Sequence, residues 1–306
     1  MTCCFQAVVI IAIDIQEMVS EAMVRLGVHI SVAGGVERAV DRALEKGCDA
    51  FQIFTSNPRG WRTKPLTEEA SQSFASHLKE SGLFPVVDHM PYLPNLASPE
   101  EDVYLKSVQA LATEVLRCRM LGIPYLVTHL GSHKGSGVEE GRSRIVRALQ
   151  TALEAASGTV TILLENSAGT RNSMGSSFED ISAIIKSREL DGGHLGVCLD
   201  TCHLHAAGYD LRTPANLKDT MNRFAGCIDI ERLKLIHLND CRGTLGSGRD
   251  RHEHLGLGHI GEEGLRAVLN HPVCRDLPMI LETPEDLRRD DIGNLDVARR
   301  LASGIK

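Results

Sequence analysis

Short apolar runs recur eight times along the chain, and each is followed by a polar turn and a longer stretch of helical pattern. The runs are six or seven residues long and rich in Val, Ile and Leu. Continuous apolar runs of this length are typical of parallel strands that are buried on both faces. The runs occupy residues 24–30, 49–55, 84–89, 124–129, 160–166, 195–200, 233–239 and 278–283. This alternation restricts the chain to an α/β fold.

The segments between the runs show helical spacing at residues 35–47, 98–122 and 141–157. Ser98 before Pro99 is a good start for the second of these helices. Eight strand and helix units over roughly 280 residues match the usual size of a (β/α)8 TIM barrel. A doubly wound open sheet more often carries a glycine-rich phosphate-binding turn, and "VAGG" is too weak a match. We predict a single-domain (β/α)8 barrel over residues 23–306, with its functional site at the carboxyl ends of the strands.

Residues 1–22 precede the first strand and helix unit. Their apolar stretch from Ala7 to Ile13 is too short to span a bilayer and lacks the flanking features of a secretory signal. The alternatives are an added strand, a disordered tail, or an extension upstream of a start at Met23. We interpret the segment as a flexible N-terminal extension outside the core.

Charge and cysteine content exclude few functions. The chain has 40 acidic and 33 basic residues, a formal charge of -7, which offers no support for a nucleic-acid partner unless bound cations neutralise some carboxylates. The nine cysteines form no CxxC pair, so we expect reduced thiols in a cytoplasmic protein. Cys198 and Cys202 are poorly spaced for a structural zinc. We expect no membrane contact and, without coiled-coil heptads, a monomer.

Residue types that bind metals stand at or next to the end of six different runs. In a barrel these side chains converge on one face. Each alone has an ordinary explanation, because a strand-end His is commonly hydrogen-bonded and a strand-end Asp or Glu commonly caps the next helix. Together they would form a desolvated cluster of carboxylates and imidazoles, which bound cations would stabilise. The six residues are His89, His129, Glu165, Asp200, His237 and Glu282.

Imidazole and carboxylate ligands without thiolates suit Zn²⁺ or Mn²⁺ better than Ca²⁺ or Mg²⁺. Six ligands exceed what one ion uses, which indicates more than one ion. Glu165 could bridge two ions about 3.5 to 4 Å apart, the usual arrangement for phosphoryl transfer.

Two loops add further candidates. His203 lies three residues after Asp200, and the glycine-rich stretch "GRDRHEHLGLGHIG" carries Asp250 and His252. An extended backbone would direct Asp250 and His252 to one side, so with His203 they could hold a separate ion. Spacing leaves three rivals open, since His254, His205 and His133 stand close to His252, His203 and His129. We interpret these three as supporting or surface residues.

At these residues the sequence resembles the endonuclease IV family of apurinic/apyrimidinic endonucleases. The most specific stretches are "GVCLDTCHLHAAGYDLR" at 196–212 and "HLNDCRGTLGSGRDRHEHLGLGHIG" at 237–261, with "ENSAG" at 165–169 and "LETP" at 281–284. Shorter similarities are "GVHISVAGG", "FTSNPRGWR", "DHMPYLPNLASP" and "THLGSH". Together they run from about Met23 to the end of the chain.

The resemblance implies a TIM barrel with three zinc ions, Mn²⁺ being possible at one or more positions. It implies that His89, His129 and Glu165 hold one ion. Glu165, Asp200, His237 and Glu282 would hold the second, and His203, Asp250 and His252 the third. It leaves His254, His205 and His133 in supporting roles.

The family acts on duplex DNA at abasic sites, inserting side chains through the minor groove and flipping the damaged nucleotide. Arg59 and Tyr92 match the inserting positions, and unstacking costs least where a base is already missing. We expect Trp61 to be a packing anchor, and Arg249 and Arg251 could meet phosphates or remain solvated.

We therefore predict metal-assisted hydrolysis of the phosphodiester 5′ to an abasic site, leaving a 3′-hydroxyl and a 5′-deoxyribose phosphate, with Glu165 as a catalytic residue. A sugar isomerase or epimerase is the alternative enzyme, because four strand-end residues could hold its single ion. Such an enzyme has no use for the five additional candidates. A lesion-binding protein without cleavage is the non-enzymatic alternative, and a complete ligand set counts against it.

Overall fold

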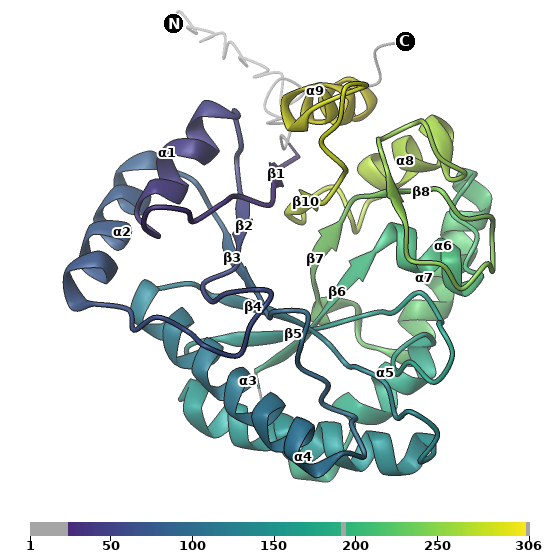
Figure 1. Cartoon of the computed structure of the whole chain (residues 1–306). Coiled ribbons are helices and arrows are strands. Elements are labelled where there is room, and N and C mark those ends of the chain that lie inside the picture. Colours follow the sequence, from purple (N-terminus) through teal and green to yellow (C-terminus); the bar gives the residue numbers. More distant parts are fainter. Residues whose placement is uncertain (1–23, 191–193, 304–306) are drawn as a thin grey trace, which may run out of the picture.

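The computed structural model describes residues 24–190 and 194–303. Its main sheet contains eight parallel strands in the order β1-β10-β7-β6-β5-β4-β3-β2, and Figure 1 shows them enclosed by helices. The strands are β1 (Leu26–Val28), β2 (Phe51–Ile53), β3 (Val86–His89), β4 (Tyr125–His129), β5 (Thr161–Glu165), β6 (Leu195–Asp200), β7 (Leu233–His237) and β10 (Met279–Leu281). Each lies inside one of the eight predicted runs.

The two ends of this strand order meet and close the barrel. An isolated parallel bridge joins His29 to Gln52, and the Ile30 N–H donates to the Gln52 carbonyl over 2.7 Å. Gly27 permits this approach, because a Cβ atom there would lie 1.8 Å from the carbonyl oxygen of Ala50. The predicted (β/α)8 barrel is confirmed, and the doubly wound sheet is wrong.

Helices follow the strands around the outside of the barrel. They are α1 (Arg38–Glu45), α2 (Glu68–Ser81), α3 (Glu101–Leu121), α4 (Val138–Ala156), α5 (Phe178–Ile185), α6 (Thr201–Ala207), α7 (Pro214–Cys227), α8 (Gly261–Asn270) and α9 (Asp291–Ala302). Two 3-10 turns, η2 (Arg188–Leu190) and η3 (Ile230–Arg232), precede β6 and β7. Two short antiparallel strands of two residues each, β8 (Asp240–Cys241) and β9 (His252–Glu253), form a hairpin between β7 and α8.

The predicted start of α3 at Ser98 was wrong. The helix begins at Glu101, and Glu100 before it has an extended backbone without a side-chain cap. Ser98 instead accepts a hydrogen bond from the Glu100 N–H over 3.2 Å. This short-range bond forms a turn before the helix, as serine commonly does.

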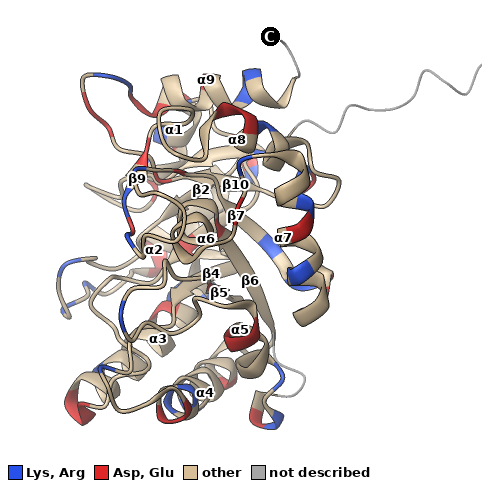
Figure 2. Cartoon of the chain, turned by 90° about the vertical axis from the view of Figure 1, so that its right-hand side faces the viewer, with Lys and Arg blue, Asp and Glu red and all other residues tan. Residues whose placement is uncertain are grey.

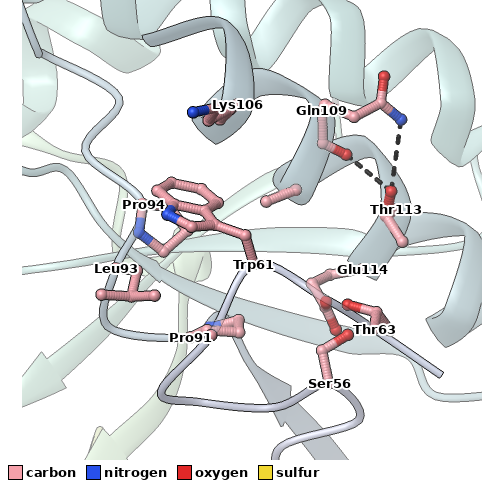
Figure 3. Close-up of a pocket in the computed structure, with 12 residues that line it drawn as sticks. Ser56, Trp61, Thr63, Pro91, Leu93, Pro94, Lys106, Gln109, Thr113 and Glu114 are labelled. Carbon is pink, nitrogen blue, oxygen red and sulfur yellow. Dashed lines mark hydrogen bonds between the residues drawn. The ribbon is translucent and has the colours of Figure 1, made fainter. Parts of the chain in front are cut away.

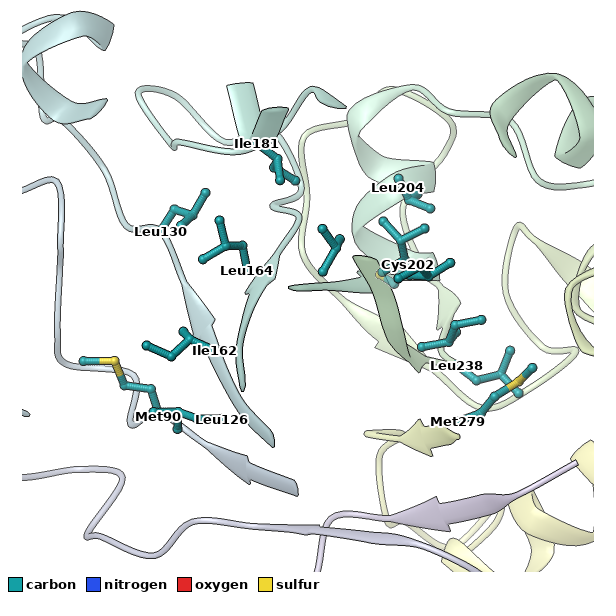
Figure 4. Packing of buried hydrophobic residues seen from close by; sticks show 14 of the residues in the cluster. Met90, Leu126, Leu130, Ile162, Leu164, Ile181, Cys202, Leu204, Leu238 and Met279 are labelled. Atoms are coloured by element: carbon teal, nitrogen blue, oxygen red, sulfur yellow. The ribbon is translucent and has the colours of Figure 1, made fainter. Parts of the chain in front are cut away.

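Two apolar layers hold the barrel together. The outer layer lies between strands and helices, and Figure 4 shows part of it around Leu126, Leu164 and Ile181. The second layer fills the barrel interior with side chains from six strands and with Ala50, which directly precedes β2. These residues, which we call the apolar ring, are Ala50, Val87, Val127, Leu163, Cys198, Leu235 and Ile280. Cys198 is thus a packing residue, which explains it without a structural zinc.

Three sequence predictions concern other parts of the chain. The extension at residues 1–22 lies outside the described residues, so its interpretation stays a prediction. The seven cysteines of the described part are all free thiols. Among the helices that the structure describes, none combines the length and apolar character needed to cross a membrane.

Candidate metal centre

A ring of polar side chains lies directly above the apolar ring, two residues further along each of the same strands. Side chains alternate along a strand, so residues two apart share a face, here the barrel interior. The two rings therefore follow from a single alternation, and the polar one stands at the carboxyl ends. These residues, which we call the polar ring, are Gln52, His89, His129, Glu165, Asp200, His237 and Glu282.

Glu165 lies at the centre of the polar ring and is 1% exposed. One carboxylate oxygen, Oε2, lies 3.2 Å from His89 Nε2 and 3.3 Å from His129 Nδ1. The other, Oε1, lies 3.0 Å from His237 Nδ1. Each oxygen thus faces a different set of imidazoles, so this carboxylate can bridge two cations.

Two groups of possible metal ligands share Glu165. His89, His129 and Glu165 form the first. Glu165, Asp200, His237 and Glu282 form the second, in which His237 Nδ1 lies 3.4 Å from Glu282 Oε2. Within each group the potential ligand atoms all lie within 4.8 Å of one another.

A third group brings α6 and the loop before β9 together. Asp250 Oδ1 lies 3.2 Å from His203 Nε2 and 3.4 Å from His252 Nε2. The hairpin holds this loop in place, because the Arg242 N–H donates to the Arg251 carbonyl over 2.9 Å. The group borders the second one, since His252 Nε2 lies 3.5 Å from Asp200 Oδ2.

Main-chain carbonyls orient three of the imidazoles. The Nδ1 atoms of His89, His203 and His252 lie 2.7 to 3.0 Å from the carbonyl oxygens of Met90, Asn166 and Glu282, respectively. A carbonyl only accepts, so each Nδ1 carries a hydrogen and donates it. In the neutral form of each ring, Nε2 then keeps a lone pair that a cation could bind, and this nitrogen faces a carboxylate.

Burial and mutual attraction shift the pKa values of these groups in opposite directions. Burial raises the pKa of Glu165, but attraction by the imidazoles of His129 and His237 outweighs burial and holds this pKa well below its usual range. Burial lowers the pKa of His203, and the carboxylates of Asp200 and Asp250 raise it by more. The pKa of Asp250 falls to about 2, because hydrogen bonding and charge attraction from His203 outweigh burial. The carboxylates of Glu165 and Asp250 are therefore ionised over the whole neutral range.

The arrangement fits divalent cations. His252 Nε2 is buried and has no hydrogen-bond partner in the described part of the chain, although two carboxylates lie within 3.5 Å of it. Such an orphaned nitrogen is costly unless something binds it. Nitrogen and oxygen donors clustered at these distances are the ligand types of zinc and manganese.

The three rival histidines belong to none of the ligand groups found among the described residues. His133 Nδ1 accepts the backbone N–H groups of Gly135 and Gly137 and so shapes a loop. His254 Nε2 lies 3.0 Å from Asp286 Oδ1. His205 is fully buried rather than on the surface, and neither ring nitrogen has a hydrogen-bond partner in the described residues.

Sequence reasoning missed four residues that touch this centre. Asn166 and Asn239 each bind Asp200, the latter through an Nδ2 to Oδ2 bond of 2.7 Å. Gln52 contacts His237, Glu282 and His29. Strand alternation would have found Gln52 and His29, because they occupy on β2 and β1 the position that ligand-type residues occupy elsewhere. For Gln52 the residue type gave no signal, because an amide is not a usual ligand of zinc.

Tyr92 and Arg59 lie on exposed loops at the barrel mouth. Tyr92 is 64% exposed, and its ring centroid lies 5.3 Å from that of Phe54 and 6.3 Å from that of His89. Arg59 is exposed on the loop after β2. Arg117 of α3 holds the start of this loop, donating from Nε to Thr55 Oγ1 over 3.0 Å.

A cavity of about 280 Å³ lies between the loops that carry Arg59 and Tyr92 and helix α3 (Figure 3). Trp61, Leu93 and Pro94 line it together with Lys106. Trp61 is 43% exposed. Because much of the indole is exposed and part of it lines a cavity, the structure does not support the expectation that Trp61 is a packing anchor.

Basic residues gather near the hairpin despite the negative net charge. Figure 2 shows blue segments on the loops around β9. Arg242, Arg249 and Arg251 are all exposed in the segment between β8 and β9. The mouth of the barrel therefore combines a buried acidic centre with exposed cationic loops.

This parallel barrel, with histidines and carboxylates gathered at its strand ends, matches over residues 40–301 the family model described as a xylose isomerase-like TIM barrel. Within this class the chain belongs to the endonuclease IV family. A relative from Methanoculleus marisnigri named "Probable endonuclease 4" is 53% identical over 281 residues, covering 92% of this chain and 99% of its own. One of the same name from Nitrosopumilus maritimus is 49% identical over 91% of this chain and 100% of its own.

Solved structures agree with this family. The crystal structure of endonuclease IV from Thermus thermophilus has a TM-score of 0.82 and 36% identity, covering 92% of this chain and 99% of that chain. A D-tagatose 3-epimerase-like protein has a TM-score of 0.69 at 20% identity, over 92% of this chain and 98% of that chain. That second likeness shows the shared fold alone.

Proposed function

We propose that this protein hydrolyses the phosphodiester 5′ to abasic sites in duplex DNA, leaving a 3′-hydroxyl and a 5′-deoxyribose phosphate. Its place in the endonuclease IV family makes it a DNA-repair endonuclease and a hydrolase. The observation that carries the proposal is the convergence of nine potential ligands around Glu165, six of them at the carboxyl ends of barrel strands and the other three from α6, β9 and the loop before β9.

We propose three zinc ions, with manganese as an alternative at one or more positions. The first would use His89, His129 and Glu165. The second would use Glu165, Asp200, His237 and Glu282, and the third His203, Asp250 and His252. When bound, such ions lower the pKa of water and neutralise developing charge on phosphate oxygens.

The protein groups supply position and charge. Glu165 presents one oxygen to each of the first two ligand groups, so its side chain sets their spacing. Asp200 is held rigidly, because its Oδ1 accepts the His203 N–H over 2.7 Å and its Oδ2 accepts from Asn239 over 2.7 Å. This rigidity favours catalysis, since ligands fixed before substrate binding need no reorganisation during the reaction.

The mouth of the barrel is suited to a distorted duplex. We propose that Arg59 and Tyr92 enter the minor groove at the lesion, where a missing base lowers the cost of unstacking. Exposed arginines such as Arg249 and Arg251 would contact backbone phosphates. We further propose that the protein works as a monomer in the cytoplasm, bound to the DNA of the nucleoid.

The alternative of a sugar isomerase or epimerase is less well supported. Glu165, Asp200, His237 and Glu282 would be enough for its single ion. The epimerase-like structure shares only 20% of its residues with this chain, whereas the endonuclease relatives reach 53%. A one-ion site would also have no use for the third group, in which His203 and His252 both face Oδ1 of Asp250.

The decisive experiment pairs elemental analysis of the purified protein with incision of a duplex that carries one abasic site. We expect about three zinc ions per chain and a single cut 5′ to the lesion. His129→Gln should remove one ion, whereas His133→Gln, outside every ligand group, should keep all of them. One ion per chain without incision would refute the proposal and favour the isomerase.

A further inference from the structure

Gln52 is a fully buried side chain that contacts two potential ligands of the second group. Its Oε1 lies 2.9 Å from His237 Nε2, and its Nε2 lies 2.6 Å from Glu282 Oε1. The same Nε2 lies 3.1 Å from His29 Nδ1. All three contacts have hydrogen-bond length, so the amide is fully engaged.

The direction of these hydrogen bonds follows from the chemistry of the partners. An ionised carboxylate only accepts, so the amide nitrogen must face Glu282 and the amide oxygen must face His237. The second amide hydrogen then points to His29 Nδ1, which accepts it. The amide therefore has one orientation that satisfies every partner.

This orientation determines which nitrogen of His237 is available to a cation. Because Gln52 Oε1 only accepts, His237 Nε2 must carry the hydrogen. Nδ1 is then the nitrogen with the lone pair, and it faces Glu165 Oε1 at 3.0 Å and Glu282 Oε2 at 3.4 Å. Glu282 is oriented at the same time, since its Oε1 is held by the amide and its Oε2 faces the ligand group.

His237 differs in this respect from three other imidazoles of the centre. His89, His203 and His252 are oriented by main-chain carbonyls, which no substitution removes. His237 depends instead on a side chain from β2, a strand that contributes no ligand of its own. The backbone role of Gln52 is separate, because its carbonyl accepts the Ile30 N–H at the closure of the barrel whatever the side chain.

We infer that Gln52 is a positioning residue of the metal centre, selecting the ring nitrogen of His237 and the carboxylate oxygen of Glu282 that face the second ion. The inference rests on the proposed function, because it requires that the second ligand group holds an ion. Partners of this kind commonly contribute about 10- to 100-fold to metal affinity.

The test measures metal binding without any DNA. Gln52→Met keeps the length of the side chain and removes its hydrogen bonds, and Gln52→Ala is the second variant. Zn²⁺ affinity is measured by competition with a chelator, and the cobalt-substituted protein is followed by its visible spectrum. Gln109→Met, an exposed glutamine on α3, is the matched control.

We expect both Gln52 variants to bind one zinc ion about 10- to 100-fold more weakly and the other two unchanged, with an altered cobalt spectrum. Gln109→Met should match the wild type. Equal affinities and identical spectra in a folded Gln52 variant would overturn the inference. So would a loss of thermal stability in the metal-free variants with all ions weakened equally, since that indicates a structural role. A wild type that binds no ion would instead refute the proposed centre itself.

Discussion

The apolar ring and the polar ring are built by the same strands, two residues apart, yet burial of their side chains has opposite effects on the stability of the fold. The apolar ring buries side chains such as Val127 and Leu163 without any polar partner, so its burial stabilises the barrel. The polar ring buries carboxylates and imidazoles, whose desolvation opposes folding unless they are paired or bound to cations. The lower ring thus holds the fold together, and the upper ring is supported by it.

This difference predicts that the two rings respond to substitution in separate measurements. A change in the apolar ring should reduce the free energy of unfolding and leave the chemistry of the folded molecules intact. A change in the polar ring should alter metal binding and catalysis and leave the free energy of unfolding of the metal-free protein nearly unchanged. Each experiment below can break this separation.

The largest effect is expected for Glu165→Gln in the polar ring. The neutral amide cannot bridge two cations, and since metal ions contribute several kcal/mol to such reactions, kcat for incision should fall at least about 1000-fold. Binding of a duplex with one abasic site should change far less. Glu140→Gln, an exposed carboxylate on α4, is the control. Wild-type turnover in Glu165→Gln would show that the bridge is dispensable, and equal losses in turnover and binding would contradict a role in the reaction itself.

The next effect belongs to the apolar ring. Leu163→Ala lies on β5 two residues before Glu165 and removes a fully buried side chain. Leu to Ala changes at such sites cost about 2 to 5 kcal/mol, because a cavity remains. Urea unfolding of the metal-free protein measures this loss. The incision rate per folded molecule should stay unchanged, and a fall comparable to that of Glu165→Gln would show that the two rings are not separable.

Metal removal should sharpen the same comparison. Zinc at about 100 times its Kd adds about 2.7 kcal/mol of stability per site. Differential scanning calorimetry with and without chelator should therefore show a higher melting temperature for the zinc-loaded wild type. Zinc should raise the melting temperature of Leu163→Ala as much as that of the wild type, although the metal-free variant melts at a lower temperature. The zinc-dependent rise should be smaller for Glu165→Gln. A zinc-dependent gain of the same size in Glu165→Gln would mean that zinc binds elsewhere.

The fold could be predicted almost completely from the sequence, because eight continuous apolar runs alternate with segments of helical spacing along the chain. Every predicted run contains a strand, and the six strand-end candidates meet at the carboxyl ends of the strands. Only boundaries were wrong, as at Ser98, where a local side-chain bond competes with the helix.

The loop residues could not be chosen from spacing alone. His252 and His254 are two residues apart, yet His254 turns to Asp286, a partner 32 residues away. Such a contact depends on how β9 is packed against the segment after β10, and no local pattern encodes it. The resemblance to a family favoured Asp250 with His252, and in the structure these two side chains face one another. Gln52 was missed for a different reason, since an amide that orients a ligand leaves no metal-binding signature in the sequence.

The smallest effect is expected at the mouth of the barrel, outside both rings. Tyr92→Ala removes an exposed ring that packs edge-on against Phe54, so neither stability nor zinc content should change. If the tyrosine wedges into the duplex, its loss should weaken the specific complex by about 1 to 3 kcal/mol, the usual worth of stacking on a base. Leu105→Ala, 56% exposed on α3 against 64% for Tyr92, is the control for loss of exposed apolar surface.

The measurement is the ratio of Kd values for duplexes with and without an abasic site. Because undamaged DNA has no gap in its stack, only the abasic duplex should lose affinity. Equal losses for both duplexes would indicate that Tyr92 contributes general surface contact, and lesion recognition would then have to lie deeper, in the polar ring itself.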